Sequence, residues 1–133
     1  MRMLKSIFLF PACLTLLAVG LPASAAELDR EAFLGTWEGR WSLDRGYRDA
    51  TLTVERVEGN TAQVIYAVGW YRRRPPFEYK GSAEFKDENT LKVDLSAYGA
   101  EAIFTLRADG KLDASWEAPG SVRPIHTTLT KQK

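Results

Sequence analysis

The chain has 133 residues, with 18 Lys and Arg against 17 Asp and Glu, and a formal net charge of +1. Hydrophobic residues make up 45% of it, which is enough for a packed core. A nucleic-acid-binding domain carries a marked basic excess, so this near-neutral balance argues against one.

The first 25 residues have the layout of a secretory signal peptide. Two basic residues precede an almost wholly apolar run over residues 7–21, and residues 23–25 read Ala-Ser-Ala, a small-x-small cleavage pattern. The run is about 15 residues, shorter than the roughly 20 that span a bilayer. We therefore expect a signal peptide over residues 1–25, cleavage between Ala25 and Ala26, and a periplasmic or secreted protein without a transmembrane segment. An uncleaved anchor is the alternative.

The remaining residues, 26–133, suit one domain. Their net charge is −1, because the signal holds two of the basic residues and none of the acidic ones. Cys13, the sole cysteine, lies inside the apolar run and is a poor match to a lipoprotein cysteine. The processed protein would then have no cysteine, which excludes disulfides and thiolate chemistry.

Hydrophobic periodicity predicts a short helical turn followed by strands. Residues 27–33 are expected to form one or two helical turns that cover one end of the fold. In the next stretch Trp37, Gly39, Trp41 and Leu43 alternate with polar residues, a pattern typical of a half-buried strand. The same period predicts eight strands, over residues 36–43, 50–57, 61–71, 77–85, 90–97, 100–107, 112–117 and 125–130.

The connections between these strands are too short for crossover helices, which excludes a parallel sheet. We therefore predict an all-β domain, a single eight-stranded antiparallel barrel with up-and-down order that closes on itself. A β-sandwich is the structural alternative.

Gly35-Thr36-Trp37, at the start of the first strand after a short helical turn, resembles the Gly-x-Trp motif of calycin barrels. These are the lipocalins, fatty-acid-binding proteins and avidins. In lipocalins an arginine late in the last strand packs on that tryptophan, whereas Lys131 occupies the corresponding place here. Because of this difference, a lipocalin-like barrel of a separate bacterial group describes the chain better. The resemblance implies binding of small apolar ligands and structural roles for Gly35, Trp37 and Lys131.

Antiparallel order sorts the connections between the two ends of the barrel. Those at residues 58–60, 86–89 and 108–111 share one end and are tight, whereas the longer ones at 44–48, 72–76 and 119–124 share the other, with a short turn at Tyr98-Gly99. The long-loop end carries a rim of arginines, against Asp44 and Asp49: Arg45, Arg48, Arg72, Arg73, Arg74 and Arg123. The inward residues nearest that end are Trp41, Leu43, Val68, Trp70, Phe77, Tyr79, Phe104 and Trp116.

Arginines above an aromatic interior suit a small amphipathic or aromatic ligand, and an anionic one in particular, because guanidinium groups pair with carboxylate or phosphate. Two alternatives stay open. An eight-stranded barrel is just wide enough for its own side chains to fill it, and three consecutive arginines are also typical of a solvated hairpin tip. A filled barrel would instead favour a protein–protein interaction module, such as an inhibitor of proteases or lysozyme.

Catalytic and metal-binding patterns are absent from the sequence. The single histidine, His126, is expected to point outward from the last strand. No Gly-x-Ser-x-Gly elbow and no phosphate-binding glycine loop occurs, and His, Cys and carboxylates are not spaced as metal ligands. We expect a protein that is not an enzyme and binds no cofactor.

Overall fold

The computed structural model describes residues 30–118 and 123–133. The predicted signal peptide, its cleavage site and residues 27–29 of the predicted helical segment lie outside the described residues, as does part of the 119–124 connection. Residues 30–33 form one helical turn, in which the Phe33 N–H donates to the Arg30 carbonyl at 3.0 Å. Phe33 is fully buried and packs edge-on against Phe85, so this turn covers one end of the barrel as expected.

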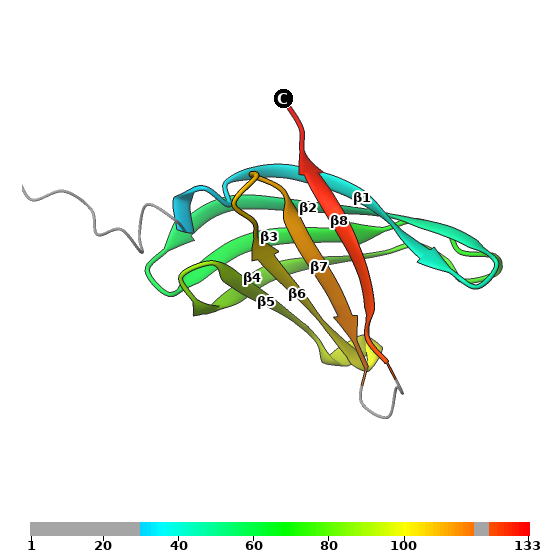
Figure 1. Cartoon of the computed structure of the whole chain (residues 1–133). Helices are drawn as coiled ribbons and strands as arrows, with labels where there is room; N and C mark the ends of the chain where they lie inside the picture. The colour runs from blue at the N-terminus through cyan, green and yellow to red at the C-terminus, as the bar shows by residue number, and fades with distance from the viewer. Residues whose placement is uncertain (1–29, 119–122) are drawn as a thin grey trace, which may run out of the picture.

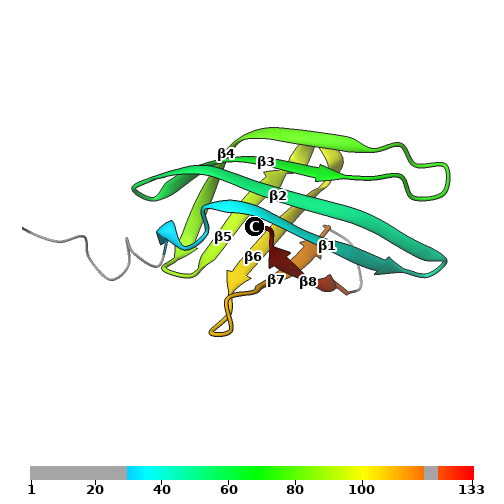
Figure 2. The ribbon, with the colours of Figure 1, turned by 90° about the horizontal axis from the view of Figure 1, so that it is seen from above.

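Eight strands follow one another in a closed barrel, each antiparallel to its neighbours (Figures 1 and 2). This confirms the predicted up-and-down barrel and excludes the sandwich. The strands are β1 (Gly35–Leu43), β2 (Gly46–Glu58), β3 (Thr61–Val68), β4 (Phe77–Asp87), β5 (Thr90–Leu95), β6 (Ala100–Leu106), β7 (Leu112–Glu117) and β8 (Ile125–Lys131), with a 3₁₀ turn, η2 (Ser96–Tyr98), after β5.

Three predicted boundaries at the long-loop end are wrong. The fifth strand ends at Leu95 rather than at residue 97, because η2 follows it. Residues 44–48 are not a loop: β2 begins at Gly46, which pairs with Leu43, so the connection is a two-residue turn. β3 ends at Val68 rather than at residue 71, because Val68 pairs with Phe77 and leaves 69–76 as the hairpin end. The first hairpin is therefore longer than predicted, and the third strand is shorter.

Two of the eight strand interfaces are hydrogen-bonded over only part of their length. Between β1 and β8 the paired residues are Trp37 with Lys131 and Glu38 with Thr130. Between β4 and β5 the pairing covers Glu84, Phe85 and Asp87 of β4. Both paired stretches lie toward the tight-turn end, and β1–β4 extend beyond β5–β8 at the other end (Figures 1 and 2). The ends of the β1–β2 and β3–β4 hairpins therefore project from the long-loop end.

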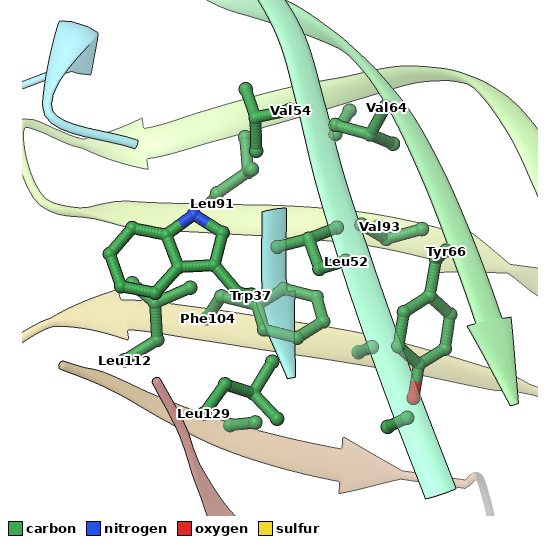
Figure 3. Close-up of a cluster of buried hydrophobic side chains, with 14 of the residues drawn as sticks. Trp37, Leu52, Val54, Val64, Tyr66, Leu91, Val93, Phe104, Leu112 and Leu129 are labelled. Atoms are coloured by element: carbon green, nitrogen blue, oxygen red, sulfur yellow. The ribbon is translucent and has the colours of Figure 1, made fainter. Parts of the chain in front are cut away.

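Large apolar side chains fill the barrel over most of its length (Figure 3). They come from alternate positions of all eight strands, as the period of two requires. The largest fully buried side chains are Trp37, Tyr66, Phe33, Phe104, Leu52, Leu91, Leu95, Leu112, Leu129, Val64 and Val93. At about 25 cal/mol per Å² of apolar surface, this burial is the main stabilising term for a fold without disulfides.

Tyr66 brings the one phenol among these fully buried residues into the core. Its hydroxyl accepts a hydrogen bond from Trp41 Nε1 at 2.9 Å. Burial raises the pKa of the Tyr66 phenol, although the hydrogen bond from Trp41 and the charge of Arg48 lower it. The neutral phenol is therefore the form that the folded barrel holds.

Gly39 lets β1 and β8 approach closely. A Cβ atom at this position would lie 2.5 Å from the Thr128 carbonyl oxygen and 2.5 Å from Leu129 Cδ2. We expect Gly39→Ala to destabilise the protein by about 3 kcal/mol, the upper part of the range for overpacking, because backbone atoms cannot move aside cheaply. Urea unfolding measures the change.

Gly69→Ala is the matched control, since its Cβ would meet nothing closer than 3.6 Å. Its stability should be unchanged or higher by up to about 1 kcal/mol. Equal losses in both variants would contradict close approach at Gly39.

Tyr66 predicts a pH dependence of stability. The unfolded chain ionises at the ordinary tyrosine pKa of about 10, whereas burial raises the folded-state pKa above it. The phenol therefore contributes its stability fully below about pH 10, and that contribution falls as pH rises further. Tyr66→Phe should reduce this fall, and should cost about 1–3 kcal/mol at neutral pH because the Trp41 N–H loses its acceptor.

Urea unfolding from neutral to alkaline pH tests both effects, with Tyr47→Phe as the control at a residue that is 63% exposed. The same alkaline slope in the parent and in Tyr66→Phe would refute this role of the phenol.

Candidate functional site

A pocket of about 330 Å³ lies at the long-loop end of the barrel, between the projecting hairpins and the β7–β8 side. Ligand pockets range over roughly 300–1,000 Å³, so this one suits a small molecule. We call it the mouth pocket; its lining residues are Trp41, Ser42, Leu43, Asp44, Arg48, Val68, Tyr71, Arg74, Trp116 and Ile125.

Two tryptophans form the aromatic floor of the mouth pocket. Trp41 on β1 and Trp116 on β7 meet edge to face, with ring centroids 6.2 Å apart. The hydrogen bond to Tyr66 fixes the Trp41 indole from below. Phe77 packs against Trp116 from the side, with ring centroids 6.1 Å apart. Beneath this floor the interior is packed core, so the pocket is shallow.

Arg48 stands on β2 at the inward position opposite Trp41. Its Nε donates to the Gly69 carbonyl and its Nη2 to the Pro75 carbonyl, both at 2.8 Å, and the guanidinium lies 5.5 Å above the Phe77 ring. These contacts hold the hairpin end at residues 69–76 against β2. Burial lowers the pKa of Arg48, and the nearby charge of Arg74 lowers it further.

Arg74 and Tyr71 reach the pocket from the β3–β4 hairpin end. Their backbones pair with each other, with N···O distances of 3.1 and 2.8 Å, which closes a two-residue turn at Arg72 and Arg73. The Tyr71 hydroxyl accepts a hydrogen bond from the Arg45 backbone N–H at 3.3 Å. Two guanidinium groups therefore border the pocket, and Asp44 is the acidic residue in its lining.

Four of the eight residues predicted for the pocket line it: Trp41, Leu43, Val68 and Trp116. Phe104 is fully buried in the core, against Tyr66. Phe77 and Tyr79 are half-buried and do not line the pocket. The Phe77 and Tyr98 rings stack with centroids 4.1 Å apart, and the Tyr79 hydroxyl donates to the Ser82 carbonyl. Trp70, predicted to point inward, is 64% exposed, because β3 ends two residues before it.

The predicted arginine rim divides into two groups. Arg48 and Arg74 line the pocket. Arg48 belongs to β2 rather than to a loop, contrary to the prediction. Arg45, Arg72, Arg73 and Arg123 are exposed and do not line it.

Sequence reasoning missed Tyr71 and Ser42 as pocket residues. Tyr71 follows the end of β3, where the alternation of the strand no longer says which way a side chain points. Ser42 lies on the outward-facing side of β1 by alternation, and only its place at the strand end brings it to the pocket. Ile125, the first residue of the strand predicted over residues 125–130, also lines the pocket and is absent from the predicted site.

Gly35, Trp37 and Lys131 meet at the opposite end of the barrel. Lys131 Nζ lies 5.2 Å from the centroid of the Trp37 ring and donates to the Ala32 carbonyl at 3.3 Å. The Trp37 indole donates to the Phe33 carbonyl at 2.8 Å. At Gly35, where φ is +121°, a Cβ would lie 2.8 Å from Lys131 Cε. These contacts tie the first strand to the last at the end of the barrel opposite the mouth pocket.

Within residues 30–118 and 123–133, no group of three or more His, Cys, Asp and Glu side chains is arranged to hold a metal ion. His126 is exposed on β8, as expected. No helix in this part of the chain is long and apolar enough to cross a membrane.

No protein-family model and no curated protein matches the sequence. Among solved structures, the chain is similar to a redesigned β-barrel, with a TM-score of 0.55 and 21% sequence identity over 79% of this chain and 96% of the other. At this identity the likeness shows the fold alone: a small eight-stranded antiparallel barrel.

Proposed function

We propose that this chain is an exported β-barrel protein that binds a small amphipathic or aromatic anion in the mouth pocket. The main support for this proposal is that Arg48 and Arg74 line the same pocket as the aromatic floor formed by Trp41 and Trp116. The layout of residues 1–25 supports export.

The two arginines supply the affinity for an anionic group. Arg48 donates to backbone carbonyls through Nε and Nη2, and a guanidinium carries five N–H donors, so it keeps donors for a ligand. Its lowered pKa reflects partial burial beside a like charge. A bound carboxylate or sulfonate would relieve that repulsion and pair with both guanidinium groups.

The packed core limits the size of the apolar part. Below Trp41 the interior holds Tyr66 and Phe104, both fully buried, so no deep calyx continues under the pocket. A single aromatic ring or a short alkyl chain suits a volume of about 330 Å³ better than a long fatty acid does. Binding, rather than catalysis, is the activity that we propose.

A protein–protein interaction module, such as a barrel that inhibits a protease or lysozyme, is the second candidate. The packed interior favours it, because such a protein needs no cavity and acts through its loops. It predicts that small amphipathic anions leave the protein unchanged.

Fluorescence titration tests the first proposal. The full chain is expressed, the processed protein is purified, and its tryptophan emission is followed while octanoate or benzenesulfonate is added. We expect saturable binding of both anions and weaker binding of octanol, which lacks the charge. Arg74→Ala should raise Kd by about tenfold or more, because it removes a charge-assisted hydrogen bond worth about 1.5–3 kcal/mol.

Arg73→Ala is the control, since it removes the same charge from the neighbouring residue outside the pocket lining. Its Kd should equal that of the parent. Titrations without any saturable change, or equal effects of the two substitutions, would refute the proposed site.

A further inference from the structure

Residues 44–49 and 69–75, which we call the paired tips, are hydrogen-bonded to each other and form one projection. The Gly69 N–H donates to the Asp49 carbonyl at 2.9 Å, and the Arg48 side chain donates to the Gly69 and Pro75 carbonyls. The Arg45 N–H adds a bond to the Tyr71 hydroxyl. These contacts join the ends of two hairpins that extend past β5–β8 (Figures 1 and 2).

Two large aromatic side chains of the paired tips lie in solvent. Trp70 is 64% exposed and Tyr47 is 63% exposed, the two highest values among the exposed large hydrophobic residues. Neither side chain belongs to the core, whose last buried residues on β1 and β3 are Trp41 and Val68. Trp and Tyr are the residues that settle at the boundary between lipid and water, where one part of the ring is apolar and the other polar.

The paired tips are also cationic. They contain five arginines against Asp44 and Asp49, and Asp49 is paired with Arg40 at 3.0 Å. Arg45, Arg72 and Arg73 are exposed and do not line the mouth pocket. Guanidinium groups pair with phosphate through two parallel hydrogen bonds, and basic residues near an anionic leaflet each favour its attachment.

Arg72 holds a backbone conformation that costs stability. Its φ is +55°, and it is the one non-glycine residue with positive φ in the described part of the chain. It is the first residue of the two-residue turn between Tyr71 and Arg74, a place where glycine is preferred in hairpins. A long cation in a strained position at the outermost point of a hairpin argues for a role outside folding.

We infer that the paired tips dock on the surface of an anionic bilayer, with Trp70 and Tyr47 at the headgroup level and Arg45, Arg72 and Arg73 on lipid phosphates. A bilayer fits this shape better than a protein partner does. Stable protein interfaces bury about 800 Å² on each side, which calls for a broad complementary surface. Two hairpin ends that project side by side offer little area, but they can enter a soft headgroup layer (Figure 2).

Vesicle sedimentation with the processed protein tests this inference. We expect it to bind phosphatidylglycerol-containing vesicles, to bind pure phosphatidylcholine vesicles much less, and to be released by salt, because surface charges are screened. Trp70→Ala, and the double variant Arg72→Gly with Arg73→Ala, should each reduce binding several-fold. Arg72→Gly alone should keep or raise the thermal midpoint while weakening vesicle binding.

The double variant Lys86→Ala with Lys111→Ala is the matched control, because it removes two exposed cations at the opposite end of the barrel. It should bind vesicles like the parent. The Trp70 and Arg72/Arg73 variants should also keep the parent's octanoate titration, which separates membrane docking from the mouth pocket.

Equal sedimentation with both kinds of vesicle, or variants at the tips that bind like the parent, would overturn the inference. Binding to soluble polyglutamate without binding to anionic vesicles would also overturn it, and would assign the paired tips to an acidic protein.

Discussion

The hydrogen bond from Trp41 to Tyr66 sets the depth at which the barrel interior changes from core to pocket. On the tight-turn side of this bond, aromatic and aliphatic side chains fill the barrel, and a buried hydroxyl is tolerated there because it accepts the indole N–H. On the other side the Trp41 ring is left as a floor, against which Trp116 packs edge to face. Without that bond, the tryptophan would have a polar N–H to satisfy elsewhere, and the floor would lose its fixed position.

Alternation was sufficient to predict the eight strands and their order, since a strand with one buried face repeats its apolar residues with a period of two. Alternation failed to predict where the backbone pairing between two strands ends. Trp70 continues the alternation of Val64, Tyr66 and Val68, but the backbone pairing stops at Val68 because β4 begins opposite it. Strand length depends on both partners, and a single-strand pattern does not contain that information. For the same reason the pattern predicts a loop over residues 44–48, although residues 46–48 pair with β1.

The arginines show how far the site could be predicted. Net charge and antiparallel order were enough to bring them to one end of the barrel, yet the three consecutive arginines have two different surroundings. Arg74 pairs with Tyr71 across the turn and reaches the pocket, whereas Arg72 and Arg73 occupy the turn itself. Arg48 was predicted at the rim and instead bridges two hairpins from an inward position. A shift of two residues in a turn decides whether an arginine lines the pocket or lies in the exposed turn. Such shifts follow from backbone geometry rather than from composition.

The shallow anion pocket is tested most directly by following the indole N–H signals of the four tryptophans by NMR, in isotope-labelled protein, while octanoate is added. Trp41 and Trp116 form the pocket floor, Trp37 lies at the far end of the core, and Trp70 stands outside the pocket. We expect saturable shifts for Trp41 and Trp116, with Trp37 and Trp70 unchanged. Shifts at Trp37, or no shift at Trp41 and Trp116, would contradict a shallow anion pocket above a packed core.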